Sequence, residues 1–310
     1  MYKKGAILTL YAETPIHMGS GQSVSYVDLP VQRERHTSFP VLWSSGIKGV
    51  IRDLASRKWN KEKVEVIFGP EDGSDFASCI SITDAKILLY PVRSVKGVFA
   101  WITCPFVLKR FKEDLRAIGI DFKVNNEDIQ IPDVSDDKVI VLNNSGLIIN
   151  NNQVALEEFC FNVESSRSDK VNKLSSFLKQ FLPENELTKN LENHLAIVSE
   201  NVFKDFVNYA VEIRTRIRID QTKGTVKEGA LFSEELIPSE SIFYSLVFIT
   251  DPFKIEKKIE NINNADNVFS EFNSLLSENS LLQLGGDETL GKGYVRVKIY
   301  PENRSQGGQS

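Results

Sequence analysis

An aspartate in a short apolar run within a long loop is the first candidate for chemistry in this sequence. Asp28 lies in the loop formed by residues 19–40, just ahead of two arginines, Arg33 and Arg35. An isolated carboxylate can act as a general base or as an oxygen ligand for a divalent cation. Loops of this length are uncommon and are often functional. An aspartate in a turn, or one paired with either arginine, would show the same spacing, and spacing alone favours that structural role.

A helix with two basic residues is predicted directly after this loop. Residues 45–58 carry apolar side chains at helical spacing, so one face should turn toward the core. Lys48 and Arg52 lie four residues apart, to the side of that face. Ser44 or Ser45 can cap the first turn, whose free N–H groups favour a phosphate. These features predict an anion site at Ser45, Lys48 and Arg52, although a solvated amphipathic helix would show the same pattern.

A glycine-rich loop near the C-terminal end resembles a nucleotide-binding motif but departs from it. The segment Gly286–Gly293, GDETLGKG, ends in glycine where a Walker A loop carries serine or threonine. It also precedes a predicted strand instead of a helix, so we reject ATP or GTP binding. Glycine lets another backbone approach closely, which suits a nucleic-acid contact, although a flexible hairpin turn has the same composition. The candidate contacts are Gly285, Gly286, Gly291, Lys292 and Gly293.

The elements that must position these residues include both strands and helices. Strands are predicted at residues 5–12, 79–92, 97–104, 241–250 and 294–300, and helices at residues 105–116, 187–210 and 267–278. We expect residues 58–78 to form a mostly charged surface loop and residues 121–152 an irregular insertion. This mixture predicts an α+β fold.

A basic hairpin is predicted in the second half of the chain. Residues 211–220 alternate between apolar and charged side chains, as a half-exposed strand does. Three arginines, Arg214, Arg216 and Arg218, share one face. The chain can turn near residue 224 and return, so the pattern indicates a hairpin with one basic face.

Composition and charge narrow the class of protein. The 310 residues carry a net charge of −5, which argues against a general nucleic-acid binder, but local basic clusters matter more than the sum. Cys79, Cys104 and Cys160 are too widely spaced for a zinc site or a disulfide framework. A reducing cytoplasm is therefore expected. The sequence has no apolar run of about 18 residues, and we expect its N-terminus to form a strand and not a signal peptide.

Four segments match one known family in order. They are residues 14–52, Leu156–Phe161 (LEEFCF), Arg216–Tyr244 and Leu284–Arg296. Together they resemble the RAMP superfamily of CRISPR proteins and, in more detail, the backbone subunits of the type III-B effector, the Cmr complex. The glycine loop alone would be a weak signal because it recurs throughout the superfamily, whereas the four segments span nearly the whole chain.

The resemblance implies an architecture that periodicity alone does not give. It implies a single domain over residues 1–310, built on an RRM-like, ferredoxin-like palm. A mostly helical or irregular insertion is expected at residues 105–210 and a thumb-like hairpin at residues 211–245. The polar tail at residues 302–310 is expected to be disordered.

The resemblance also implies a function. Family members bind guide RNA (crRNA) and cleave complementary target RNA as endoribonucleases, together with other Cmr subunits and with copies of themselves stacked head to tail along the guide. Asp28 falls where the family carries the acid needed for cleavage, and it would also hold any divalent metal ion, Mg²⁺ or Mn²⁺. His17 matches a family histidine nearer the guide RNA, and Glu234 or Glu235 lies in a segment tied to cleavage. The implied RNA contacts outside the glycine loop are Arg33, Arg35, Ser45, Lys48, Arg52, Arg216 and Arg218.

Two other functions fit the same residues. The chain could be a structural RAMP subunit that binds crRNA without cutting RNA. It could also be a guide-processing ribonuclease that uses His17 and cuts repeat RNA without other subunits. Replacing Asp28 by alanine separates the first of these from the target nuclease.

Overall fold

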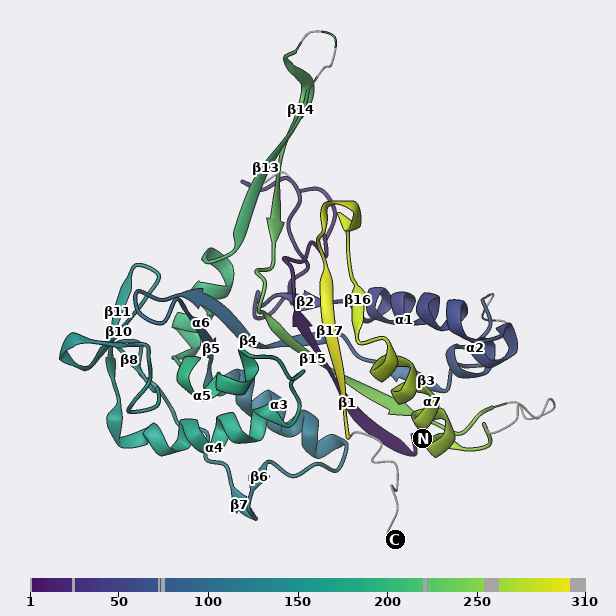
Figure 1. The fold of residues 1–310 in the computed structure, drawn as a ribbon, viewed down its shortest axis with the longest axis horizontal. Helices are drawn as coiled ribbons and strands as arrows, with labels where there is room; N and C mark the ends of the chain where they lie inside the picture. The colour runs from purple at the N-terminus through teal and green to yellow at the C-terminus, as the bar shows by residue number, and fades with distance from the viewer. Residues whose placement is uncertain are drawn as a thin grey trace.

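The computed structural model describes residues 2–23, 26–71, 73, 76–219, 222, 224–253 and 262–301, with the backbone alone at residues 151, 218 and 227–230. Its centre is a sheet with the strand order β12-β5-β4-β15-β1-β17-β16 (Figure 1). The strands are β1 (Lys4–Ala12), β4 (Ala85–Arg93), β5 (Phe99–Thr103), β12 (Leu195–Ile197), β15 (Ile242–Ile249), β16 (Leu281–Gln283) and β17 (Tyr294–Tyr300). Two short strands extend it, since β2 (Val41–Leu42) pairs with β4 and β3 (Ile80–Ile82) with β15.

Four of these strands form a ferredoxin-like core. In space β17, β1, β15 and β4 lie side by side, and each neighbouring pair is antiparallel. Along the chain α1 (Ser44–Lys58) follows β1, and α7 (Ala265–Glu278) connects β15 to the last pair of strands. This is the βαββαβ order of the fold, so the predicted RRM-like palm is confirmed.

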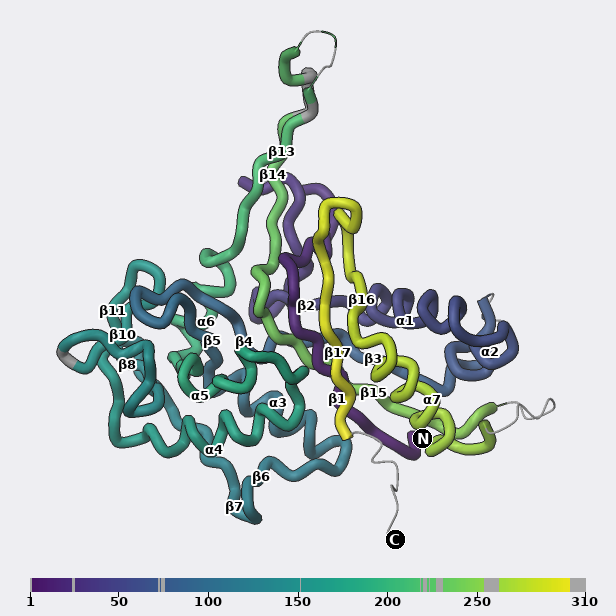
Figure 2. Tube along the Cα trace, viewed as in Figure 1, coloured from purple at the N-terminus to yellow at the C-terminus, as the bar shows by residue number. Residues whose placement is uncertain are grey.

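The composition of β1 matches its central position in the sheet. Ile7, Leu8 and Leu10 are fully buried, because the strand has neighbours on both edges and helices or loops over both faces. Helix α7 packs on β1, β15 and β17. Figure 2 shows α1, α2 (Lys61–Phe68) and α7 on one side of the central strands and the inserted helices on the other. No helix in the described part of the chain is long and apolar enough to cross a membrane.

The predicted insertion contains short helices around a small sheet. Its helices are α3 (Pro105–Ala117), α4 (Ser168–Lys179), α5 (Leu191–His194) and α6 (Glu200–Tyr209). A four-stranded sheet of β8 (Lys138–Val139), β11 (Phe159–Val163), β10 (Gln153–Leu156) and β9 (Ile148–Ile149) packs beside them, and β6 (Lys123–Val124) pairs with β7 (Glu127–Asp128). Strand β12 rejoins the central sheet, parallel to β5.

The prediction of one helix over residues 187–210 is wrong. The chain forms α5, then β12, then α6 within this range. Leu195, Ala196 and Ile197 are all buried and pair with β5, so the tertiary pairing overrides the helical spacing of the apolar residues. Ser199 then starts α6 by accepting a hydrogen bond from the backbone N–H of Val202, at 3.2 Å.

The prediction of a surface loop over residues 58–78 is wrong in its first half. Helix α2 (Lys61–Phe68) starts at Asn60, whose side chain accepts from the backbone N–H of Lys63. Val64, Ile67 and Phe68 are buried at spacings of three and four residues. In the sequence these apolar residues alternate with lysines and glutamates of the solvent face, so the segment as a whole is strongly charged.

The predicted hairpin projects from the body of the molecule (Figure 1). Strand β13 (Glu212–Ile219) pairs with β14 (Val226–Leu236) in antiparallel register. Ile213 and Ile217 are each about half exposed and Leu231 is 65% exposed. The alternation predicts that the apolar side chains of the hairpin are buried, but these three are exposed. The hairpin therefore presents apolar as well as charged side chains.

Candidate functional site at the base of the hairpin

The structure fixes Asp28 against strand β14. The backbone N–H and the hydroxyl of Ser233 both donate to Asp28 Oδ2, at 2.7 and 2.8 Å, and the Asp28 N–H donates to the same hydroxyl at 3.1 Å. The next residue, Leu29, continues this contact by exchanging backbone hydrogen bonds with Ser233 and Glu235. The long loop is therefore bound along the root of the hairpin, and Asp28 has a defined orientation.

These hydrogen bonds set the charge of Asp28. The Ser233 backbone N–H, followed by its hydroxyl, stabilises the carboxylate and holds the pKa of Asp28 below its usual range. Within the described part of the chain, the other oxygen of Asp28, Oδ1, accepts no hydrogen bond from another residue. Asp28 is exposed on the edge of a hollow of about 440 Å³, which Gln22, Leu231 and Phe232 also line. An ionised carboxylate with one free oxygen thus faces a space open to solvent.

An ionic cluster lies on the neighbouring part of β14. Arg216 Nη1 donates to Glu234 Oε2 at 2.9 Å and to Asp287 Oδ1 at 2.7 Å. Partial burial acts to raise the pKa of Asp287, but the hydrogen bond and the positive charge of Arg216 act against it, and the pKa is lowered. The cluster ties the hairpin to the glycine-rich loop through Arg216, which is held by two carboxylates in this state of the chain.

His17 lies between the hairpin and the glycine-rich loop. Its Nδ1 is 2.8 Å from the carbonyl oxygen of Glu235, and its own carbonyl accepts from Gly286 N at 2.9 Å. Because a carbonyl can only accept, His17 Nδ1 carries a proton and donates it to this oxygen. Asp287 interacts electrostatically with the ring, so His17 and the ionic cluster belong to one region.

Two glycines of the glycine-rich loop are explained by packing inside the protein. A Cβ at Gly285 would lie 2.3 Å from the His17 carbonyl oxygen, and one at Gly293 would lie 2.0 Å from that of Leu284. Both residues also have positive φ angles. Gly286 and Gly291 are exposed and have more space, and Lys292 lies beside them. Packing therefore accounts for Gly285 and Gly293, and close approach of a nucleic-acid backbone remains a prediction for Gly286 and Gly291.

The two glutamates that the sequence could not separate have different environments. Glu235 Oε2 accepts from the backbone N–H of Val31 at 2.9 Å, and Oε1 pairs with Arg33. Arg33 also donates to the carbonyl of Val207, so its guanidinium is used within the protein. This geometry gives Arg33 and Glu235 a bracing role, and it leaves Glu234 as the member of the pair that joins the ionic cluster.

The remaining arginines differ in accessibility. Arg35 is exposed and forms no ion pair within the part of the chain that the structure describes. The side chain of Arg218 lies outside the described residues. Arg35 is therefore the residue of the predicted arginine group that is free to meet a phosphate.

The start of helix α1 differs from the prediction. The residue that precedes the helix is Trp43, which has no side-chain capping bond, so neither Ser44 nor Ser45 is the cap. The carboxylate of Asp84 accepts from the Ser44 N–H at 2.7 Å. An acidic side chain thus already occupies the anion position at this terminus, which weighs against a phosphate there. Ser45 is exposed one residue further on.

The basic side of α1 is partly used within the protein. Arg52 Nη1 donates to the carbonyl oxygen of Gly69 at 2.7 Å. Burial, and then the positive charge of Arg52, lower the pKa of Lys48. Gly49, next to Lys48, is exposed with no other atom near its Cβ position. The surface around Lys48 and Gly49 would let a backbone approach closely.

The residues at Asp28 can supply part of a metal site. Within the described residues, no group of three histidine, cysteine, aspartate or glutamate side chains is arranged to hold a metal ion. The free Oδ1 of Asp28 does fit one position on Mg²⁺ or Mn²⁺, ions that keep several waters and take other ligands from substrate phosphates. Any such ion would depend on the RNA for most of its ligands.

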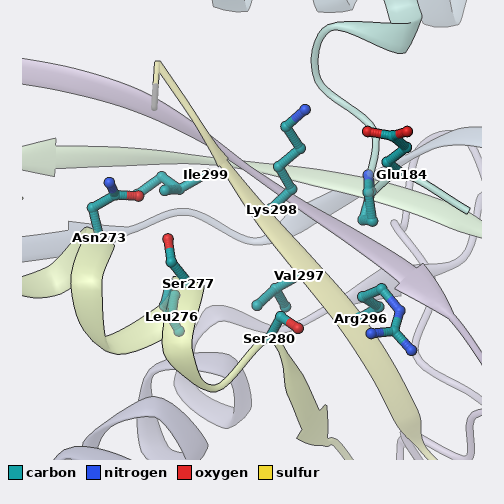
Figure 3. Close-up of a pocket in the computed structure, with 10 residues that line it drawn as sticks. Glu184, Asn273, Leu276, Ser277, Ser280, Arg296, Val297, Lys298 and Ile299 are labelled. Carbon is teal, nitrogen blue, oxygen red and sulfur yellow. The ribbon is translucent and has the colours of Figure 1, made fainter. Parts of the chain in front are cut away.

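A second hollow lies away from these residues. It has a volume of about 400 Å³ and is bordered by α7, β17 and the loop at Glu184 (Figure 3). Asn273 and Ser277 face it from α7, and Lys298 projects from the far side of β17. None of the predicted site residues with a described side chain lines it, so the candidate site remains the root of the hairpin.

Two residues of this site were not predicted from the sequence. Ser233 orients Asp28 from 205 residues away, and Asp287 shares Arg216 with Glu234. Both lie inside segments that carried the resemblance, since Ser233 belongs to LFSEEL and Asp287 to GGDETL. Polar residues in those segments were the available signal, but their partners could not be identified without the fold.

Comparisons with known proteins identify the family of this chain. The family model of the RAMP superfamily matches residues 9–296. The chain is 39% identical over 302 residues to the CRISPR system Cmr endoribonuclease Cmr4 of Pyrococcus furiosus, covering 96% of both chains. It superposes on the crystal structure of oligomeric Cmr4 from the same organism with a TM-score of 0.72, at 34% identity over 96% of this chain and 97% of the other.

A more distant likeness concerns the fold alone. A chain in the cryo-EM structure of the Type III-B Cmr-beta bound to cognate target RNA gives a TM-score of 0.71 at 22% identity, covering 96% of this chain and 98% of that chain. The matching family model spans most of the chain, and the Pyrococcus relative matches it nearly from end to end. The chain therefore belongs to the RAMP superfamily and, within it, to the Cmr4 family of type III-B CRISPR subunits.

Proposed function

We propose that this chain is the backbone subunit of a type III-B effector, that it binds guide RNA, and that it cleaves complementary target RNA as an endoribonuclease. The observation that carries the proposal is the Asp28 carboxylate, held by Ser233 at the edge of a hollow at the root of an exposed hairpin. The Pyrococcus relative is named a Cmr endoribonuclease. The position of Asp28 supports a nuclease over a structural subunit, because a buried brace would not need a free carboxylate oxygen.

RNA binding is assigned to phosphate contacts that carry no sequence information. Lys48 and Gly49 on α1, together with exposed Arg35, offer positive charge and close backbone approach. Such contacts supply affinity, while base pairing with the guide reads the target sequence. The net charge of −5 fits this division, because only a local surface needs to attract RNA.

The chemistry follows from the nucleophile that RNA already contains. The 2′-hydroxyl must align with the leaving 5′-oxygen, and unstacked RNA reaches that geometry more easily than a regular duplex. The exposed apolar side chains of β13 and β14, such as Ile217 and Leu231, are suited to wedge between bases and separate them locally. Asp28 lies at the foot of this wedge.

The lowered pKa of Asp28 bears on its role. Hydrogen bonds from Ser233 keep the carboxylate ionised and make it a weaker base. This favours holding a divalent ion, or positioning a hydroxyl by a hydrogen bond, over strong general-base catalysis. A bound Mg²⁺ or Mn²⁺ would supply stabilisation of the charge that develops on the phosphate. His17 is assigned to the guide side of the same region.

Assembly is part of the proposal. We assign copies of this chain to a head-to-tail stack along one guide, together with other Cmr subunits in the cytoplasm. The solved Pyrococcus relative is described as oligomeric. A heterologous contact repeated along a guide gives an open helix, so sizing with guide RNA should show a ladder of species instead of a closed dimer.

The deciding experiment removes the carboxylate and keeps the shape. Complexes reconstituted with Asp28→Asn should bind guide and target RNA normally but fail to cut, because an amide is a poor base and a weak metal ligand. Asp53→Asn, an exposed aspartate on α1, is the matched control and should cut normally. Target binding is measured on the same samples, so that loss of cutting is separated from loss of assembly.

The cleavage products give a second reading of the same experiment. Attack by the 2′-hydroxyl leaves a 2′,3′-cyclic phosphate and a 5′-hydroxyl, whereas attack by water leaves other ends. If Asp28→Asn complexes cut target RNA at the wild-type rate, Asp28 is only a turn residue. The alternative function, a structural subunit that binds crRNA without cutting RNA, would then be favoured.

A further inference from the structure

A cavity on the insertion is lined by residues that the RNA site does not use. It has a volume of about 500 Å³ and lies between the turn of the β10–β11 hairpin and the C-terminal end of α6. Part of one wall comes from Leu156–Phe161, a segment that carried the family resemblance. We propose that this cavity binds an arginine side chain presented by another, basic protein chain.

The first observation is a pair of exposed aromatic rings. Phe159 is 59% exposed and Tyr209 is 79% exposed, and both line the cavity. Phe159 is held in place by Phe206, with ring centroids 6.1 Å apart. Aromatic side chains that remain this open beside a cavity mark an interaction surface more often than a folding requirement. Their flat faces suit a planar, weakly hydrated group.

The second observation is the charge around the rings. Glu157, Glu158 and Asp205 line the cavity, and Arg93 is the cation paired with the first two. The Arg93–Glu158 pair is largely exposed, so it is weak and can exchange partners. Asp205 makes no ion pair with any residue that the structure describes. The surplus of carboxylates repels RNA phosphates and attracts a cation.

The third observation is the direction of α6. The cavity lies at the C-terminal end of this ten-residue helix, and its last turn has no basic residue. The negative end of a helix dipole stabilises a cation placed there, and Arg33 already uses part of this effect by donating to the carbonyl oxygen of Val207 at 2.9 Å. Glu157 is fixed beside it, because its carboxylate accepts from the Arg93 backbone N–H at 2.7 Å. Ring faces and carboxylates therefore converge on one cationic guest.

Arginine on a foreign chain fits better than the alternatives. Guanidinium can stack on a ring and donate to a carboxylate at the same time, which an ammonium group does less well. The chain itself has a net charge of −5, so copies repel one another at long range, whereas a basic partner is attracted. The proposal is independent of the nuclease function, since none of the residues that carry it belongs to the RNA site.

The test uses a small probe and the full chain. N-acetyl-arginine methylamide is titrated into the isotope-labelled protein and compared with the citrulline analogue, which has the same shape without the charge. Amide resonances of Phe159, Asp205 and Tyr209 should shift in a saturable way, and citrulline should bind at least about tenfold more weakly. Equal binding of the two compounds, or shifts confined to other surfaces, would overturn the proposal.

Substitutions at the cavity sharpen the result. Tyr209→Ala and Asp205→Asn should each weaken arginine binding by about fivefold or more, while Asp53→Asn on α1 should leave it unchanged. All three positions are exposed, so circular dichroism should show an intact fold. Binding that survives both cavity variants would show that the probe does not use this cavity.

Two further measurements test the choice of occupant. Spermidine that binds more tightly than the arginine compound would identify a polyamine site and reject the protein partner. Sedimentation of the protein alone should be the same for wild type and Tyr209→Ala. Loss of self-association in that variant would make the occupant a second copy and overturn the assignment to a foreign chain.

Discussion

Replacing Arg33 by alanine tests whether this arginine braces the hairpin or contacts RNA. Its guanidinium donates to Glu235, to Asn208 and to the carbonyl oxygens of Ser38 and Val207. The Arg33 side chain is 20% exposed and that of Glu235 only 6%. The variant therefore leaves a buried carboxylate without its counter-charge, which costs about 3–5 kcal/mol of folding free energy.

The expected loss can be measured by thermal unfolding. An unfolding entropy of about 2.1 cal/mol/K per residue gives roughly 0.65 kcal/mol/K for the 310 residues. A destabilisation of about 3–5 kcal/mol then lowers Tm by about 5–8 °C. Arg35→Ala is the matched control, two residues away and exposed, and its Tm should change by less than about 1 °C.

RNA binding should show the reverse pattern: Arg35→Ala should change it, and Arg33→Ala should not. Arg35→Ala should reduce the slope of log affinity against log salt by about one unit, as for one lost phosphate contact. Arg33→Ala, assayed well below its Tm, should keep the wild-type slope. If Arg33→Ala instead keeps its Tm and loses slope, the guanidinium contacts phosphate and the bracing argument is refuted.

Three other substitutions test the site and its support. Ser233→Ala removes one donor to Asp28, so the lowered pKa of Asp28 rises toward its ordinary value. The carboxylate is then protonated at a higher pH on acidification, and the acid limb of the pH–cleavage profile shifts to higher pH. Ser233→Thr should restore the wild-type profile. Lys48→Ala should lower the salt slope of guide binding by about one unit, and an unchanged slope in anisotropy titrations would make α1 purely structural. Gly285→Ala should lower Tm well beyond the effect of Gly291→Ala, because only the former Cβ meets a backbone oxygen, at 2.3 Å; equal Tm values would contradict the packing argument.

Much of the ferredoxin-like core could be predicted from the sequence because each element buries its own periodic face. The helical spacing of residues 45–58 gave α1, and the alternation of residues 294–300 gave β17. The helix predicted at residues 187–210 failed because Leu195–Ile197 pairs with β5, a contact that no local pattern contains. Propensity is overridden where a distant strand offers a neighbour.

The candidate site was harder to predict for the same reason. The resemblance pointed to Asp28, but the residue that orients it, Ser233, is 205 positions away. Spacing suggested a serine cap and a phosphate at α1, whereas the fold brings Asp84 to that position. Arg33 and Arg35 look alike in sequence, and only the burial of Glu235 distinguishes a brace from an exposed cation.

The attachment of the long loop to the hairpin makes the position of the Asp28 carboxylate independent of the outer part of the hairpin. Among the described residues, the hydrogen bonds that fix the side chains of Asp28 and His17 to β14 fall at Ser233 and Glu235, close to the body. The strand pair at Ile217 and Leu231 lies further out. The outer hairpin can therefore be shortened, lengthened or exchanged without moving the carboxylate. In the function proposed above, target engagement and the geometry of the cut would then be modular along a single pair of strands, and chimeric hairpins offer a route to change one while keeping the other.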